Sequence, residues 1–422
     1  MTERYGVSRR SFTRAAVAIG GASALAACVD RADDTASVPQ GTDDPDALPE
    51  RQHAWSDALP TDDHGNEVNA RHHLLLYLNV GDGTPTDGDR ETVESALRTL
   101  ERAYEWSSEG LLFTLGYSPA YFERFSAPLP DSVDLPAPEP LAAFEEPDPD
   151  EQDAVLHLAS DRARVVLEAE EAMRGNRDTA NGVAVESTLA EVFEVADRRT
   201  GFIGDGLPAE NDDVDGIPEG EVDEDAPLYM GFKSGFEKNQ APEDRVTIRE
   251  GPFAGGTTQH VSKIQLHLDQ WYEQDSREAR VAKMFCPVHA TEDRVEGVGE
   301  NLGDDSGMSE CPAHAEDDAR EMGMVGHSQK AARAREEDDT PLILRRDFDS
   351  TDDDRAGVHF LALQRRIGDF VDTREAMNGD DVSGTGGVGT RHNNGILQYM
   401  TVHRRGNFLV PPRAKRALPR PE

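Results

Sequence analysis

The sequence is poor in aromatic residues and in positive charge. Phe, Trp and Tyr make up 6% of its 422 residues, so the core must be mostly aliphatic. Lys and Arg number 43 against 83 Asp and Glu, which gives a formal net charge of -40. A surface of this sign repels nucleic acid and acidic lipid head groups, so we expect neither as a partner. The acidic excess is spread along the chain, which is typical of adaptation to high salt, because screening removes the self-repulsion.

The longest apolar stretch near the start of the chain, Ala15 to Ala27, is too short to span a bilayer as a stable helix. It follows Ser8-Arg9-Arg10-Ser11-Phe12, a twin-arginine signature, and it ends in Leu25-Ala26-Ala27-Cys28, which resembles a lipobox. This order predicts a signal segment at 1–28, twin-arginine export and a lipid anchor on Cys28 at the extracellular face of the membrane, as in a haloarchaeal-type lipoprotein. The alternative is a basic N-terminus followed by an incidental alanine-rich helix.

Residues 29–70 are rich in Asp, Pro, Thr and Gly and have no apolar periodicity, so they are predicted to form a disordered acidic tether. Residues 71–208 then alternate between strand and helix patterns. The predicted order is strand 73–80, helix 89–105, strand 111–117, strand 154–158, helix 162–173 and strand 191–195. The order β-α-β-β-α-β is that of a ferredoxin-like unit.

After an acidic linker at 209–226, residues 227–419 are predicted to form a second such unit with an acidic insertion at about 287–325. Its predicted elements are a half-buried strand at 255–268, a helix at 276–285, two strand ends within 345–364, a helix at 369–377 and a closing strand at 395–402. The fold class is therefore α+β, with two tandem ferredoxin-like units whose antiparallel sheets carry helices and pack sheet to sheet.

The segment from Gly326 to Gln364 is the strongest candidate for chemistry. His327 is followed eighteen residues later by the pair Arg345-Arg346 at the end of a short apolar run. A buried arginine requires an anionic partner, and an imidazole can ligate a metal or a haem iron. The simpler interpretation is a solvated histidine and an arginine paired with a surface carboxylate, because a lone histidine is a weak signal.

This segment resembles the haem-binding core of the dye-decolorizing (DyP-type) peroxidase family, particularly its exported deferrochelatase-like branch. The family has Ser-His-Ile-Arg around its proximal histidine, where this chain has Gly326-His327-Ser328-Gln329. A Leu-Arg-Arg-Gly strand start and a Gly-Leu-Leu-Phe-Val-type strand ending in Gln follow in the family. Leu344-Arg345-Arg346 and the run from Gly357 to Gln364 stand in their places here. Other stretches match in order, so the resemblance extends from about Arg71 to Pro419.

The resemblance implies a dimeric α/β-barrel of the DyP type and allows for a homodimer. It implies haem b held non-covalently, since no Cys-x-x-Cys-His motif is present. By resemblance His327 is the iron ligand, Arg345 stabilises charge on the leaving oxygen of hydrogen peroxide, and Arg346 and Gln329 are further cofactor contacts. The family motif Gly-Phe-x-Asp-Gly corresponds to residues 231–235, where Ser234 replaces the catalytic acid.

That replacement leaves the function open between two classes. Serine is a poor base, and losing an acid/base group costs about two to four decades of rate. The first hypothesis is a peroxidase that oxidises an unknown reducing substrate, with proton transfer through water near Ser234. The second is a haem- or porphyrin-binding lipoprotein with little turnover, and a scaffold that has lost haem is a third. Asp205 follows Gly201-Phe202 at a longer spacing and is interpreted as a turn residue, and His260 and His267 as structural or solvent-facing.

A repeated Cys-Pro-x-His motif marks a second candidate site. Cys286 and His289 form the first copy, and Cys311 and His314 form the second. Two thiolates and two imidazoles can hold zinc or iron in tetrahedral geometry. A disulfide between Cys286 and Cys311, which conditions outside the cell favour, and a pair of free thiols are the alternatives.

Overall fold

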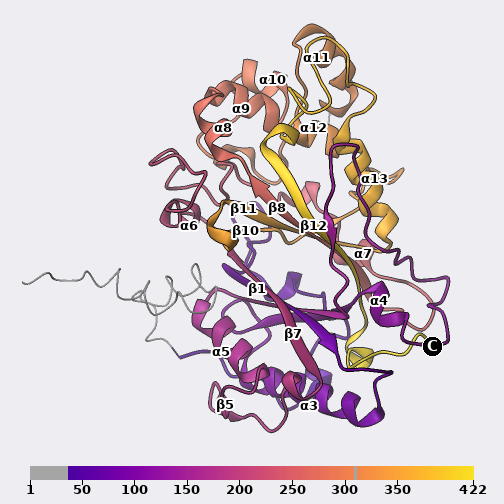
Figure 1. The fold of residues 1–422 in the computed structure, drawn as a ribbon. Helices are drawn as coiled ribbons and strands as arrows, with labels where there is room; N and C mark the ends of the chain where they lie inside the picture. Colours follow the sequence, from indigo (N-terminus) through magenta and orange to yellow (C-terminus); the bar gives the residue numbers. More distant parts are fainter. Residues whose placement is uncertain (1–36, 308–310) are drawn as a thin grey trace, which may run out of the picture.

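The computed structural model describes residues 37–307 and 311–422 (Figure 1). The twin-arginine signature, the lipobox and Cys28 lie outside the described residues. Within the described part of the chain, no helix is both long enough and apolar enough to cross a membrane.

The N-terminal half of the sheet has the predicted ferredoxin-like order. Its strands lie side by side as β7-β1-β4-β2, and every neighbouring pair is antiparallel. The prediction of a β-α-β-β-α-β unit is confirmed, although the last strand is longer and begins two residues later than predicted. The elements are β1 (His72–Val80), α3 (Asp87–Ala103), β2 (Leu112–Tyr117), β4 (Ala154–Ser160), α5 (Ala163–Met173) and β7 (Phe193–Phe202).

Helix α3 shows how local sequence builds this half. The Thr86 side chain accepts from the Asp89 backbone N–H and the Asp89 carboxylate accepts from that of Thr86, a capping box that starts the helix. Val93, Leu97 and Leu100 then recur at helical spacing and are completely buried. They join one continuous core cluster with the outward face of β1, β2 and β4 and with α5. Helices α3 and α5 are therefore packed directly against the sheet through this cluster, and we call this the solid half.

The C-terminal half repeats the strand order as β12-β8-β11-β9. The predicted closing strand at 395–402 is wrong in its position, because a 3-10 turn at Leu397–Tyr399 occupies that segment and the strand begins only at Met400. The long run after Met400 pairs with β8 along its whole length, which the apolar pattern before it did not reveal. The elements are β8 (Thr257–Leu266), β9 (Leu344–Arg345), β11 (Gly357–Gln364), α13 (Ile367–Asn378) and β12 (Met400–Val410).

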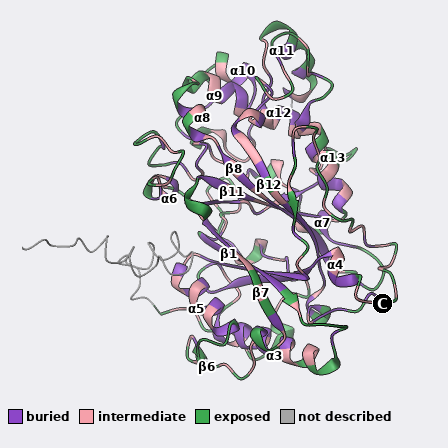
Figure 2. Ribbon diagram, viewed as in Figure 1, coloured by how far each residue is buried: buried purple, intermediate pink, exposed green. Residues whose placement is uncertain are grey.

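The two halves close into a barrel. At one seam β2 pairs with β12, and at the other the short strand β10 (Phe348–Ser350) pairs with both β7 and β11. A side chain at Gly201 is excluded at the second seam, because its Cβ would lie 2.0 Å from the Asp349 carbonyl oxygen. The predicted sheets thus join edge to edge around an interior that includes the buried rings of Phe348 and Phe408. Figure 2 shows β1 and much of the rest of the sheet as buried, with exposed residues on β7.

Between β8 and β9 the chain forms a group of short helices that lie at one end of the molecule, uppermost in Figure 1. The predicted helix at 276–285 is confirmed as α9, whereas the predicted domain boundaries remain predictions. The disorder predicted for 29–70 is wrong over the described residues 37–70, because Trp55 is buried there and the Gln52 side chain accepts from the Leu115 backbone N–H at 2.9 Å. The helices between β8 and β9 are α8 (Leu268–Glu273), α9 (Arg277–Met284), α10 (Pro287–Thr291), α11 (Ala315–Glu321) and α12 (His327–Ala331). The remaining short elements are α4 (Pro119–Phe122), β3 (Asp148–Pro149), β5 (Thr179–Ala180), β6 (Val183–Ala184), α6 (Leu207–Glu210) and α7 (Glu243–Val246).

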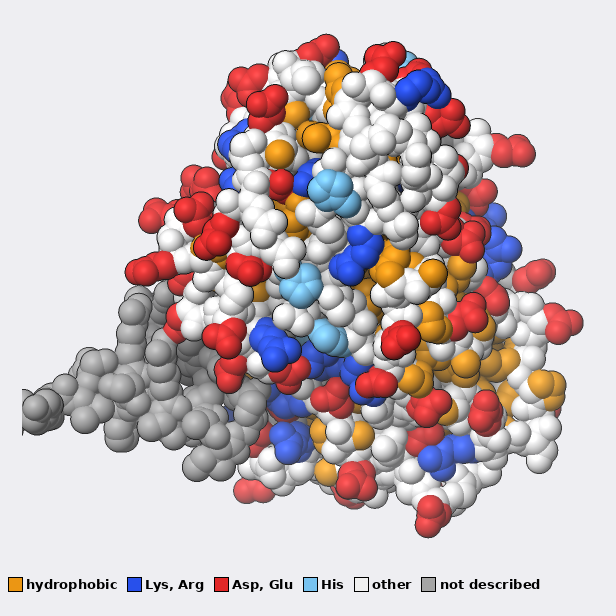
Figure 3. Space-filling model, turned by 45° about the horizontal axis from the view of Figure 1, so that its top comes forward, with side chains coloured by type: hydrophobic (Ala, Val, Ile, Leu, Met, Phe, Trp, Pro, Cys, Tyr) orange, Lys and Arg blue, Asp and Glu red, His pale blue; other side chains and the backbone are white. Residues whose placement is uncertain are grey.

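Several of the scarce arginines are buried in ion pairs and do not reach the surface. Acidic side chains are spread over the face of the molecule that Figure 3 shows. A buried charge is tolerated only when it is paired and hydrogen-bonded. The pairs in which both side chains are buried are Arg199 with Asp150 at 2.6 Å, Arg405 with Glu145 at 2.8 Å and Arg416 with Glu101 at 3.1 Å, and the buried Arg346 pairs with the half-buried Glu243 at 3.0 Å.

Candidate functional site

The C-terminal half contains a cavity of about 250 Å³ between the outer face of its sheet and the inserted helices. Its lining is mainly apolar and comes from β8, β11, the loop before β8 and helix α12. His327, Ser234 and Arg345 all line it, although they are separated by up to 111 residues in the chain. The structure therefore brings together the three residues that the resemblance singled out.

His327 begins helix α12, and close packing fixes its backbone. Gly326 precedes it, and a Cβ there would lie 1.7 Å from the Phe285 carbonyl oxygen, so only glycine allows this approach. The Gln329 side-chain oxygen accepts from the Gly326 N–H at 3.0 Å, and the Lys330 ammonium donates to the Met377 carbonyl at 2.6 Å. These contacts tie the histidine-bearing turn to α9 on one side and to α13 on the other.

The imidazole of His327 has no hydrogen bond to any described residue, and its Nδ1 is buried. Burial, together with the nearby charges of Lys330 and Arg345, lowers its pKa to about 3. The ring is therefore neutral at ordinary pH. A neutral, unpartnered imidazole at a cavity is the form that ligates a metal.

Ser234 and Arg345 contact each other in another part of the cavity lining. The Arg345 Nη1 donates to the Ser234 Oγ at 3.2 Å, and no carboxylate of the described residues forms an ion pair with this guanidinium. Strand β9 positions the arginine by pairing with Ala362 of β11, and Gln240 accepts from its backbone N–H at 3.0 Å. An unpaired cation at the edge of an apolar cavity is suited to an anionic or polarised ligand.

Two carboxylates that the sequence analysis did not identify line the same cavity. Asp347 and Asp349 follow Arg345 at alternate positions, while Phe348 between them points into the barrel interior. Asp349 accepts a hydrogen bond from the Tyr229 backbone N–H, and burial raises its pKa well above the usual range. Asp347 is half-buried and has no hydrogen bond or ion pair to a described residue. The alternation on either side of Phe348 was the signal that could have found them.

Arg346 and Gln329 do not line this cavity. Arg346 points to the other side of its strand, where it pairs with Glu243 and lies 4.3 Å from the Trp55 ring centroid. Gln329 is fully buried and donates to Asp318 at 2.6 Å, so it supports α12 from behind. Strand alternation and helix capping direct both side chains away from the cavity, and their cofactor contacts stay predictions.

The remaining candidates, Asp205, His260 in β8 and His267 just after β8, occupy structural positions. Asp205 lies in an exposed turn after β7, between two glycines with positive φ. His260 is buried against the Phe370 ring, with 3.7 Å between ring centroids, and bonds Asn407 at 2.8 Å. His267 is half-buried and contacts Thr401 at 2.9 Å.

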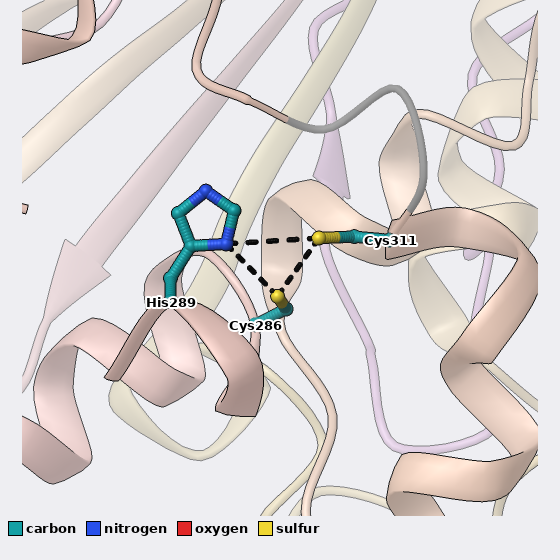
Figure 4. Close-up of side chains that lie close together, drawn as sticks. All are labelled: Cys286, His289 and Cys311. Carbon is teal, nitrogen blue, oxygen red and sulfur yellow. Dashed lines mark hydrogen bonds between the residues drawn. The ribbon is translucent and has the colours of Figure 1, made fainter. Parts of the chain in front are cut away.

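The structure brings together three of the four residues of the repeated Cys-Pro-x-His motif. Cys286, His289 and Cys311 are buried, with their ligand atoms within 4.8 Å of one another (Figure 4). The two sulfurs are 2.9 Å apart and not bonded. His314 is exposed and is not part of the cluster, so the predicted fourth ligand is absent from it.

A closed antiparallel barrel of two ferredoxin-like halves, with helices outside, is the fold of the DyP-type peroxidases. DyPB from Rhodococcus jostii RHA1 has 18% identity and a TM-score of 0.56, over 83% of this chain and 95% of that one. The encapsulated DyP-type peroxidase from Mycobacterium smegmatis has 13% identity and a TM-score of 0.54, over 86% and 99%. At these identities the likeness concerns the fold alone.

Within this fold class, the chain belongs to a family of unknown function, DUF7405, whose model matches residues 70–412. A comparison with curated proteins found no match.

Proposed function

We propose that this protein is a haem-dependent peroxidase of the dye-decolorizing type, which reduces hydrogen peroxide while oxidising a separate substrate. The observation that carries the proposal is the convergence of His327, Ser234 and Arg345 on one apolar cavity. A structural neighbour, a variant of the Rhodococcus jostii RHA1 protein, is described as a complex with heme. Its fold likeness supports haem as the cofactor here.

The residues present fit haem by their chemistry. The neutral, unpartnered ring of His327 would hold the iron, and the apolar lining from β8 and β11 suits the macrocycle. Arg374 and Arg405 add cationic side chains to the lining, and each has one buried guanidinium nitrogen without a hydrogen bond. Guanidinium groups are suited to carboxylates such as the propionates of a porphyrin. Since no Cys-x-x-Cys-His motif is present, the haem would be held non-covalently, and the resemblance to the DyP-type family implies haem b.

Bound haem would supply an iron centre that accepts peroxide and transfers electrons to it. The chain's own residues then bind and polarise the peroxide. Arg345 stabilises negative charge on the departing oxygen, and Ser234 orients the guanidinium by accepting its hydrogen bond. Asp347, which lines the cavity without a partner, takes the proton that Ser234 cannot, because a carboxylate is the better base. Asp349 already accepts a hydrogen bond from the Tyr229 backbone N–H, so Asp347 is the carboxylate better suited to this role.

A second candidate function is haem or porphyrin binding with little turnover. Ser234 favours this second function, because the side chain that contacts Arg345 is a hydroxyl and not the carboxylate that would act as a base. The two functions share the cofactor and differ in whether peroxide reacts.

The test is reconstitution of the full chain with haem at high salt. The parent should show a Soret band, and His327→Ala should lose it while keeping its far-UV circular dichroism. His267→Ala is the matched control, since that histidine is half-buried at the outer surface of the same half and should leave the band unchanged. An unchanged spectrum in His327→Ala would refute the ligand, whereas haem binding without any reaction with peroxide would leave the binding function in place of the peroxidase.

The proposal extends to location. The twin-arginine signature around Arg9 and Arg10 and the lipobox ending in Cys28 support export and lipid anchoring at the outer face of the cell membrane. Export through the twin-arginine pathway carries folded proteins, which suits a cofactor inserted before export. Metabolic labelling with a fatty acid, compared between the parent and Cys28→Ala, would test the anchor.

A further inference from the structure

The cluster of Cys286, His289 and Cys311 lies in the inserted helices (Figure 4). None of the three lines the cavity, although the neighbouring residues Phe285 and Ser306 do. Cys286 precedes α10 and His289 lies one turn later, so both side chains fall on one face of that helix. The Cys286 Sγ is 3.0 Å from the His289 Nδ1, and the Cys311 Sγ is 3.6 Å from the same nitrogen. All three side chains are buried, so the arrangement is not a surface coincidence.

The orientation of His289 indicates what the cluster is for. Its Nε2 lies 3.0 Å from the carbonyl oxygen of Ser306, and a carbonyl can only accept, so Nε2 carries the proton. The Nδ1 lone pair is therefore directed at the two sulfurs. Metal-ligating histidines commonly donate their other ring nitrogen to a backbone carbonyl in this way, which fixes the tautomer for ligation. A disulfide would give this oriented nitrogen nothing to bind.

We propose that Cys286, His289 and Cys311 bind a zinc ion through three protein ligands, with water at the fourth position. Zinc favours thiolate and imidazole ligands in tetrahedral geometry. Bond lengths of about 2.3 Å to sulfur and about 2.1 Å to nitrogen put sulfur and nitrogen about 3.6 Å apart and two sulfurs about 3.8 Å apart. The Cys311–His289 distance of 3.6 Å meets this requirement. The Cys286–His289 distance of 3.0 Å must lengthen by about 0.6 Å, and the sulfurs must separate by about 0.9 Å, as the ion enters.

The site lies directly behind the helix that carries His327. The carbonyl of Cys311 accepts from the Gln329 side chain at 2.9 Å, and the carbonyl of Phe285, next to Cys286, accepts from the Gln329 backbone at 3.2 Å. Zinc thus joins α10 to the Cys311 turn, and both segments support α12. The binding of zinc itself does not depend on haem, so it is testable in the haem-free protein.

The test is metal content by mass spectrometry of the full chain, purified with reductant and without chelator. The parent should carry one zinc per chain, and Cys286→Ser, Cys311→Ser and His289→Ala should each lower zinc affinity by at least about 100-fold, since even supporting residues are worth 10–100-fold. His314→Ala is the matched control, because it alters the same motif but an exposed side chain, and it should keep its zinc. Equal loss of zinc in His314→Ala would overturn the three-ligand site.

Parent protein alone also decides the question if the variants do not fold. Cobalt substituted for zinc should give a thiolate-to-cobalt charge-transfer band in the near ultraviolet, and a chelator should remove it while two thiols become reactive. Absence of bound metal, together with a denatured, unreduced chain in which Cys286 and Cys311 resist alkylation, would show a disulfide and overturn the proposal. Metal-free protein with both thiols reactive would overturn it as well.

Discussion

The two halves of the barrel have the same strand order, but the outer faces of their sheets are covered differently. In the N-terminal half, α3 and α5 pack directly on the sheet, and one hydrophobic cluster of aliphatic and aromatic side chains lies between them. In the C-terminal half, the connection from β8 to β9 is expanded into α8 to α12, and a cavity remains beneath it. Both halves have the same sheet, so the cavity results from the long connection between β8 and β9 and not from the sheet itself.

Charged side chains face the helices in the C-terminal half but not in the N-terminal core cluster. The cavity lining carries Arg345, Asp347 and Asp349 on one strand segment, whereas the outer core of the N-terminal half is built from Leu, Val, Ala and aromatic side chains. A solid core contributes stability, while a cavity with unpaired polar groups costs stability and is retained for binding. Changes in the two halves should therefore have different kinds of effect.

The largest effect on the rate of the peroxide reaction is expected from the charged side chains of the C-terminal half, which contains the cavity. Arg345→Leu should lower the rate at which peroxide changes the haem spectrum by about 10²–10³-fold, because one preorganised donor to a developing negative charge is worth that much. Asp347→Asn should lower the same rate by about two decades or more if this carboxylate moves the proton. Stopped-flow measurements at high salt, with haem content matched, would check both. A full rate in Asp347→Asn would remove Asp347 from the mechanism.

Ser234→Asp changes the same part of the cavity lining and should raise the rate. A carboxylate there would be drawn to Arg345, which keeps it ionised, and should raise the peroxide rate by about ten-fold, with a thousand-fold as the upper bound. Adding Arg345→Leu should depress the rate in both the Ser234 and the Ser234→Asp backgrounds. If neither the parent nor Ser234→Asp reacts with peroxide while both bind haem, the binding function replaces the peroxidase.

A matched pair of leucines sharpens the contrast in packing. Leu156 of β4 is fully buried in the solid half, and Leu266 of β8 lines the cavity. Leu156→Ala should lower the free energy of unfolding by about 2–5 kcal/mol, and Leu266→Ala by clearly less, since part of the space beside it is already empty. Urea unfolding of the haem-free protein measures both. Equal losses would mean that the cavity closes in solution.

Acid should distinguish the halves least, because both bury neutral histidines. Burial lowers the pKa of His73 in β1 to about 3 and that of His260 in β8 well below its usual value. The unfolded histidines regain a pKa near 6.5, so the unfolded chain binds more protons as the pH falls from about 6.5 toward 3, and stability is lost in that window. Each such histidine should cost on the order of 1–2 kcal/mol at pH 5 relative to pH 7. Urea midpoints that agree at the two pH values would contradict this.

The sequence predicted the elements where local patterns decide them. The capped helix α3 and the apolar strand β1 followed from spacing and capping residues alone. The closing strand β12 was misplaced because the register with β8, which is distant in sequence, determines where it begins. Similarly, the resemblance identified His327 and Arg345, whereas the direction of Arg346 and the presence of Asp349 depend on which face of a short strand meets the cavity.

The two seams of the barrel determine the order in which it can fold. Strand β2 at one edge of the N-terminal half pairs with β12, and β7 at the other edge pairs with β10. A ribosome releases β1 to β7 long before either partner emerges, so the nascent N-terminal half has two open edges that can pair with another chain. Contacts between segments so far apart in sequence also form slowly. The solid half is thus the more stable part of the finished barrel and the more aggregation-prone part of the growing chain.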